Sequence, residues 1–158
     1  MAKITKVYIF ASDYFKQATI MIDQSIFDAE YYVIDILPSQ IPAERGAAYS
    51  EAEKFFLQEP HLTLLRQKFA RLAIKLGCYS DITMEYNDFE LSTPVPSMIY
   101  DTIINCKPND WVVLHFTQNN CAITYNGDDL YMTFYNPDGN LLKLAEKICG
   151  AEGLFLRK

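Results

Sequence analysis

The chain has 158 residues, of which 50% are hydrophobic, 22% charged and 14% aromatic, with a formal net charge of −6. This composition fits one globular domain, residues 1–158, with a core of ordinary size. Six glycines and seven prolines exclude a collagen-like or low-complexity protein, and 11 Tyr with 10 Phe exclude the aromatic-poor composition of disordered chains. Since no stretch has the length of a membrane span and the first residues lack a leader cleavage site, we expect a cytoplasmic protein that does not associate with membranes.

The N-terminal segments alternate between strand-like and helix-like patterns. The apolar run 6–10 lacks helical spacing and predicts a strand. Apolar residues at helical spacing predict a helix over 14–28, although 20–22 also fits a strand, and the β-rich run 31–37 ends at Pro38. Together they predict a β-α-β unit, with a right-handed crossover if its strands are parallel and adjacent.

The central third contains the clearest helix pattern. A helix is expected over 47–58, before Pro60, and a second over 62–76, with Gly77 as its C-cap. The second helix carries five apolar residues at alternating spacings of three and four, which places them on one face: Leu62, Leu65, Phe69, Leu72 and Leu76. A weakly alternating strand over 82–91 and a short helix over 98–103 follow.

The last third predicts an antiparallel β-meander. Its strands are 111–116, 121–125 and 130–135, joined by a turn at Asn119-Asn120 and by a type I′ signal at Asn126-Gly127. A helix over 141–149, before Gly150, and a short strand over 154–156 close the chain. We therefore expect an α+β or mixed α/β fold in a single domain.

The meander has two faces because strand residues alternate. A two-residue loop at Asn119-Asn120 would pair His115 with Thr124 and Phe116 with Ile123. The expected core face comprises Val112, Leu114, Phe116, Cys121, Ile123, Tyr125, Leu130, Met132 and Phe134. The opposite face comprises Trp111, Val113, His115, Thr117, Ala122, Thr124, Tyr131, Thr133 and Tyr135. We expect the first set to pack against helices 62–76 and 141–149.

Residue patterns argue against several kinds of chemistry. The four cysteines have no zinc-ligand spacing, and we expect them to be reduced thiols, mostly buried as small hydrophobic side chains. His115 and Cys121 are expected on opposite faces, which argues against a Cys-His nucleophile pair. Glycine-rich phosphate loops and a G-x-S-x-G motif are absent. The sequence therefore implies no cofactor and no metal site.

Negative charge is concentrated in residues 78–142, which contain nine acidic side chains and one basic side chain, Lys107. The acids are Asp81, Glu85, Asp88, Glu90, Asp101, Asp110, Asp128, Asp129 and Asp138. This balance disfavours nucleic acid as a partner, because phosphates must be met by positive charge. The basic helix residues, Arg66, Lys68, Arg71 and Lys75, are expected to pair with the acidic segment or to be solvated.

Size and charge favour a small acidic interaction protein that binds a basic protein partner, as immunity or antidote proteins do. The candidate partner-binding residues are Asp128, Asp129, Tyr131, Tyr135, Trp111 and His115, because acids steer basic partners and aromatic residues supply interface hot spots. Two alternatives remain open. One is a small enzyme that acts on a neutral or cationic small molecule through carboxylates or an aromatic pocket, and the other is a homodimer through the aromatic face.

Overall fold

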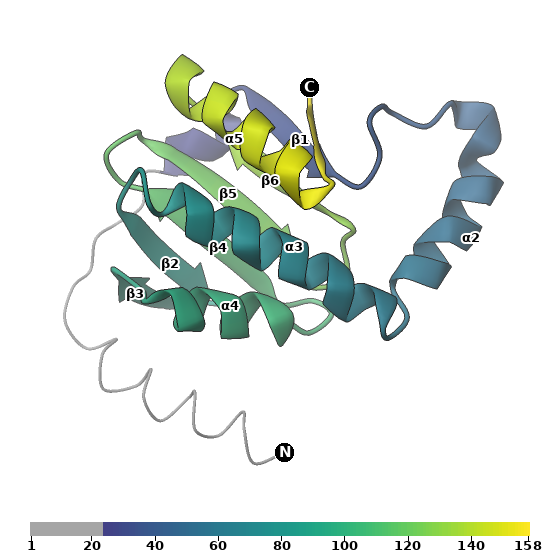
Figure 1. Cartoon of the computed structure of the whole chain (residues 1–158), viewed down its shortest axis with the longest axis horizontal. Helices are drawn as coiled ribbons and strands as arrows, with labels where there is room; N and C mark the ends of the chain where they lie inside the picture. Colours follow the sequence, from purple (N-terminus) through teal and green to yellow (C-terminus); the bar gives the residue numbers. More distant parts are fainter. Residues whose placement is uncertain (1–23) are drawn as a thin grey trace, which may run out of the picture.

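A seven-stranded sheet organises the computed structural model, which describes residues 24–158 (Figure 1). Its order is β3-β2-β4-β5-β6-β1-β7, and every neighbouring pair is antiparallel. The strands are β1 (Tyr31–Asp35), β2 (Ile82–Tyr86), β3 (Phe89–Ser92), β4 (Trp111–Phe116), β5 (Cys121–Asn126), β6 (Tyr131–Tyr135) and β7 (Phe155–Arg157).

Helices flank the sheet, so the α+β fold and the predicted β4-β5-β6 meander are confirmed. The α-helices are α2 (Gly46–Phe56), α3 (His61–Leu76), α4 (Pro96–Ile104) and α5 (Gly139–Glu152), and the 3-10 helices are η1 (Gln24–Asp28) and η2 (Ala43–Arg45). Helices α3, α4 and α5 lie side by side over one face of the sheet, whereas α2 extends away from it (Figure 1). Within residues 24–158, no helix combines the length and apolarity that crossing a bilayer requires.

The hydrophobic core lies between the sheet and these three helices. Every residue of the predicted core face is buried and belongs to one cluster. Leu65, Phe69, Leu72 and Leu76 of α3 enter the same cluster, and the rings of Phe69 and Tyr125 lie 5.3 Å apart. The prediction that alternation alone identifies the inner sheet face is therefore confirmed.

The opposite face carries a second, smaller cluster. Ile26 of η1 packs there on Val113 and Ala122, and all three are buried. The ring of Phe27 meets the ring of Tyr135 edge-on at 5.2 Å. Within residues 24–158, the helix that packs on this face is thus a single 3-10 helix.

The β4-β5 register differs from the prediction by two residues. His115 faces Ala122, and Phe116 faces Cys121, because residues 117–120 form a four-residue loop. The Asn119 N–H donates to the carbonyl of Phe116 over 3.1 Å, and Asn120 has a φ of 48°. A shift of two residues preserves the alternation of faces, which explains why the core prediction survives the register error.

Two turn predictions are wrong. Neither Asn126 nor Gly127 has a positive φ, so the expected type I′ turn does not form there. Asn87 and Asp88 have φ values of 46° and 28° instead, and this two-residue turn divides the predicted strand 82–91 into the β2-β3 hairpin. The Asp129 N–H donates to the Asn126 carbonyl over 3.1 Å, closing a four-residue loop.

Two boundary predictions also need correction. Helix α5 continues past Gly150 to Glu152, and its C-cap is Gly153, whose φ of 71° is the left-handed conformation that glycine adopts readily. The strand predicted over 6–10 and most of the helix predicted over 14–28 lie outside the described residues. The described end of that helix is 3-10, and β1 pairs antiparallel with both neighbours rather than in a parallel unit.

Candidate functional site

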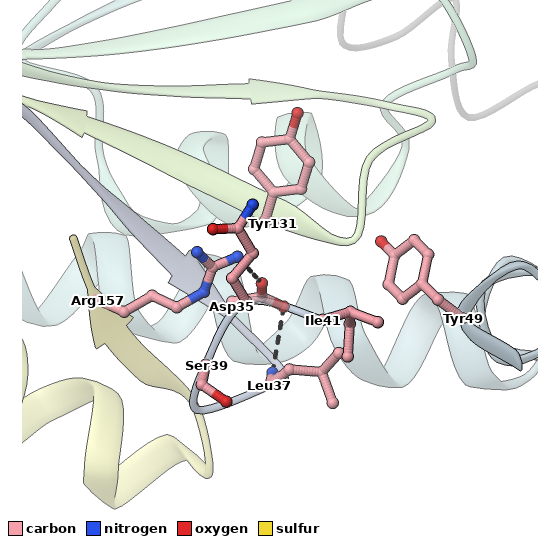
Figure 2. Close-up of a pocket in the computed structure, with 8 residues that line it drawn as sticks. Asp35, Leu37, Ser39, Ile41, Tyr49, Tyr131 and Arg157 are labelled. Carbon is pink, nitrogen blue, oxygen red and sulfur yellow. Dashed lines mark hydrogen bonds and ion pairs between the residues drawn. The ribbon is translucent and has the colours of Figure 1, made fainter. Parts of the chain in front are cut away.

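A shallow hollow of about 210 Å³ lies where the ends of β1, β6 and β7 approach α2 (Figure 2). Its lining combines two tyrosines, an acid, a base, polar side chains and two aliphatic residues: Asp35, Leu37, Ser39, Gln40, Ile41, Tyr49, Tyr131 and Arg157. The sequence pattern identified Tyr131 as a candidate and missed the others.

Asp35 forms the base of the hollow at the end of β1. Its Oδ1 accepts a hydrogen bond from the Leu37 N–H over 3.1 Å, so the carboxylate caps the turn that leaves the strand. Its Oδ2 accepts from Arg157 Nη2 of β7 over 2.7 Å. Asp35 is 8% exposed and its charge is matched by Arg157.

Two tyrosines come to the hollow from different elements (Figure 2). Tyr131 lies beside Asp35 across the β1-β6 ladder, and Tyr49 belongs to α2. Burial is the largest cause that raises the pKa of both hydroxyls. Nearby carboxylates raise them further, chiefly Glu53 for Tyr49 and Asp129 for Tyr131. Both phenols therefore lie in a region of negative potential and stay protonated at neutral pH.

The β5-β6 loop carries the two predicted acids beside this hollow. Asp128 is exposed, whereas Asp129 is half-buried and accepts a hydrogen bond from Asn126 Nδ2 over 3.0 Å. Burial raises the pKa of Asp129 most, the Asn126 hydrogen bond opposes that rise, and Asp128 adds to it. Of the two acids, Asp128 is thus the one that is exposed to solvent.

Arg66, a buried residue of α3, binds the backbone of the same loop. Its guanidinium is buried and donates to the Tyr125 hydroxyl over 3.1 Å, to the Ile104 carbonyl over 3.1 Å and to the Gly127 carbonyl over 2.7 Å. Three donors in a fixed fork give a defined position to the backbone they meet. The buried Arg66 therefore fixes the backbone of the loop that carries Asp128 and Asp129, so this loop is not a free hairpin tip.

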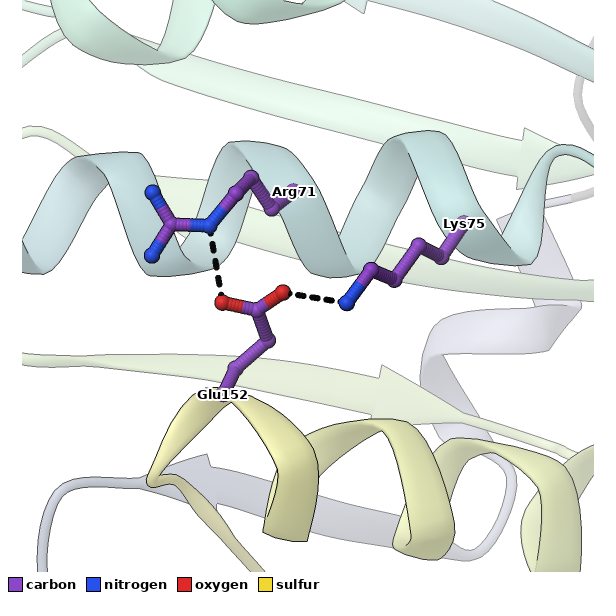
Figure 3. A network of polar contacts seen from close by, with 3 residues as sticks. All are labelled: Arg71, Lys75 and Glu152. Carbon is purple, nitrogen blue, oxygen red and sulfur yellow. Dashed lines mark hydrogen bonds and ion pairs between the residues drawn. The ribbon is translucent and has the colours of Figure 1, made fainter.

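Two of the three remaining basic residues of α3 connect this helix to α5. Arg71 Nε and Lys75 Nζ donate to the two oxygens of Glu152 over 2.8 and 2.6 Å, which ties α3 to α5 (Figure 3). Glu152 lies outside the acidic segment 78–142 that we expected to provide the counterions. Arg66 does reach that segment by hydrogen bonds, through the Tyr125 hydroxyl and the Ile104 and Gly127 carbonyls.

The other three predicted site residues, Trp111, His115 and Tyr135, lie on the same sheet face as Tyr131 but outside the hollow. His115 is 8% exposed, and within residues 24–158 neither ring nitrogen has a hydrogen-bond partner. Burial lowers the pKa of His115, so its ring is neutral at pH 7. Trp111 and Tyr135 are half-buried beside the cluster of Ile26. Asp128, Asp129 and Tyr131 thus lie at or beside the hollow, whereas Trp111 and His115, on β4, and Tyr135, at the other end of β6, do not line it.

The described side chains offer little for nucleophilic or metal chemistry. All four cysteines are free, and burial raises the pKa of Cys106, Cys121 and Cys149 to about 12, which keeps these three as thiols. Cys121 faces the helices, away from His115. Among residues 24–158, no three His, Cys, Asp or Glu side chains come together as ligands for a metal ion.

Comparison with models of protein families, with curated proteins and with solved structures finds no match to this chain. Its function must therefore be inferred from its own geometry. What the described residues offer is an acidic surface with tyrosines and a shallow hollow, defined by Glu53, Tyr49, Tyr131, Asp128 and Asp129 and called the acidic tyrosine surface below.

Proposed function

We propose that this protein is a small acidic interaction protein that binds a basic protein partner through the acidic tyrosine surface. The observation that carries the proposal is the position of exposed Asp128 and half-buried Asp129 beside Tyr131, which is 37% exposed, and Tyr49. Carboxylates attract a basic partner over distance, and tyrosines supply contact area at low entropic cost.

The shape of the surface favours a binding role over catalysis on a small molecule. Typical ligand sites enclose about 300 to 1,000 Å³, whereas this hollow holds about 210 Å³ and is open to solvent. Its buried carboxylate, Asp35, is already engaged by Arg157 and by the Leu37 N–H. Such a hollow can receive one side chain of a larger partner but does not surround a substrate.

The charge of the whole chain supports the same proposal. The net charge is −6, and nine acids against one base lie in residues 78–142. This charge favours a basic protein partner over nucleic acid, and a mode of action like that of immunity or antidote proteins. A cytoplasmic location is a separate part of the proposal. A homodimer through the face of Trp111 and Tyr135 remains a separate hypothesis.

A paired capture experiment tests the proposal. The wild-type protein and an Asp128→Asn/Asp129→Asn variant serve as baits in extracts of the native host, and captured proteins are compared by quantitative mass spectrometry. We expect a basic protein that the wild type enriches and the variant captures several-fold less. An Asp101→Asn/Glu146→Gln bait, altered at exposed acids of α4 and α5, removes the same two charges and controls for net charge. Equal capture by all three baits, or partners without basic surfaces, would contradict the proposal.

A further inference from the structure

The hollow has an electrostatic character of its own. Asp35 and Arg157 neutralise each other through their 2.7 Å ion pair. The negative potential that remains comes from Asp129, with Asp128 and Glu53 beside the two tyrosines. An occupant with a positive charge is therefore favoured.

We infer that the hollow between Tyr49 and Tyr131 seats one cationic side chain, an arginine or a lysine, of the basic partner. This inference rests on the proposed function and specifies the anchoring contact within it. The aromatic faces of Tyr49 and Tyr131 attract a cation through their quadrupoles. Ser39 and Gln40, which also line the hollow, carry oxygen atoms that can accept its N–H groups.

An anionic occupant fits the same hollow less well. The Nη2 of Arg157 donates to Asp35, whose charge offsets that of the guanidinium, and its Nε, which has no hydrogen-bond partner among the described residues, is buried from solvent. An incoming anion would also meet the negative charge of Asp129. The shallow shape suits a single protruding side chain, because the aliphatic stem can pack on Leu37 and Ile41 while the charged head reaches the tyrosines.

Titration of the full chain with a small arginine probe tests this inference. N-acetyl-arginine amide is added to protein with isotope-labelled tyrosines, and ring resonances are followed by NMR. We expect saturating shifts at Tyr49 and Tyr131, and no saturation with N-acetyl-citrulline amide, which has the same shape without the charge. Equal shifts with the citrulline probe, or saturation with N-acetyl-aspartate amide instead, would overturn the inference.

Matched variants assign the binding to the hollow. Tyr49→Ala removes one ring from a helix without buried residues, so the fold is kept, and we expect the affinity for the arginine probe to fall about two- to fivefold. Tyr79→Ala, at a tyrosine that is 64% exposed elsewhere, should leave it unchanged. An unchanged affinity in Tyr49→Ala, or equal losses in both variants, would refute the assignment.

The two proposals can fail separately. A basic partner could be captured through Asp128 and Asp129 while the arginine probe leaves the tyrosine resonances unshifted. The proposed function would then stand, and the inference of a cation-binding hollow would be wrong. If the probe saturates the hollow but the paired capture yields no acid-dependent partner, the seat stands as a cation site and the proposed function is wrong.

Discussion

Gly127 is the residue on which the position of the acidic loop depends most directly. A Cβ added at Gly127 would lie 1.9 Å from the carbonyl oxygen of Lys107, so the two backbone segments approach too closely for any side chain. Gly127→Ala must displace one segment, and we expect the free energy of unfolding to fall by about 1 to 3 kcal/mol in urea denaturation. The loop that carries Asp128 and Asp129 would shift with it.

The matched control is Gly150→Ala, in helix α5. A Cβ at Gly150 meets nothing within 4 Å, and alanine stabilises a helix relative to glycine by up to about 1 kcal/mol. We therefore expect this variant to unfold at a slightly higher urea concentration than the wild type. Equal effects of the two substitutions would show that the contact between Gly127 and Lys107 does not constrain the loop.

His115 provides a second test at the residue scale, through pH. Burial holds the pKa of His115 below its unfolded value near 6.5, so the unfolded chain binds the proton first as pH falls. The folded state therefore loses stability as pH drops below about 6.5 towards the folded pKa. In His115→Leu we expect part of the decline in unfolding free energy between pH 7 and pH 5 to disappear. An identical pH profile in both proteins would contradict a neutral, buried ring.

For single residues, the sequence can predict a structural role that depends only on neighbouring positions along the chain. Asp138 carries such a local signal, although we predicted no cap there: it stands just before a helical pattern, and its carboxylate accepts from the N–H groups of Asn140 and Leu141. The Asp35 and Arg157 pair could not be foreseen, because these residues are 122 positions apart and meet only through the β1-β7 pairing. The hollow was missed for the same reason.

The apolar stripe of helix α3 packs against the sheet, and substitutions at two leucines of this helix test that packing. Leu72 is fully buried and Leu64 is 54% exposed on the same helix. Leu72→Ala should lower the free energy of unfolding by about 2 to 5 kcal/mol, the usual cost of such a core cavity. Leu64→Ala, the same chemical change, should cost less than about 1 kcal/mol. Comparable losses in chemical denaturation would mean that the stripe does not face the sheet.

The contact between α3 and α5 depends on a shared carboxylate (Figure 3). Burial alone would raise the pKa of Glu152, but the hydrogen bonds and charges of Lys75 and Arg71 outweigh it and lower that pKa. The resulting stabilisation is present above the unfolded pKa near 4.5 and is lost as pH falls through the lower folded pKa. We expect Glu152→Gln to cost about 1 to 2 kcal/mol at pH 7.

The pH dependence separates this role from a general effect of charge. The difference between wild type and Glu152→Gln should shrink as the wild-type carboxyl becomes protonated, and thermal unfolding at pH 7 and pH 3 measures it. Glu146→Gln, at an exposed acid of the same helix, should leave stability at pH 7 nearly unchanged. A difference that is constant with pH would contradict the ion pairs.

Elements were predictable where periodicity is strong and less so at turns. Apolar residues spaced three and four apart predict the stripe of α3, and apolar residues at every second position predict the three strands of the meander. The type I′ turn was expected at Asn126-Gly127, yet it forms at Asn87-Asp88, where both residues have positive φ. Gly127 is needed for its contact with Lys107, and a sequence motif cannot distinguish the two uses of glycine.

At the scale of the whole molecule, strand order is the part that sequence patterns do not contain. The meander places β4, β5 and β6 side by side, but β1 joins β6, and β7 joins β1, from opposite ends of the described chain. That arrangement brings Asp35, Tyr131 and Arg157 together. The candidate acids and Tyr131 could be predicted from charge and turn position, whereas Tyr49 depends on where α2 leaves the sheet.

The central claim is that Asp128 and Asp129 direct a basic partner to this surface. Once the paired capture has yielded such a partner, its association rate with the full chain is measured by stopped flow at low and high salt. We predict that the wild-type rate falls at least about tenfold as salt rises, and that the Asp128→Asn/Asp129→Asn variant associates slowly at low salt with a weaker salt dependence. The same association rate and salt dependence in both proteins would contradict the claim.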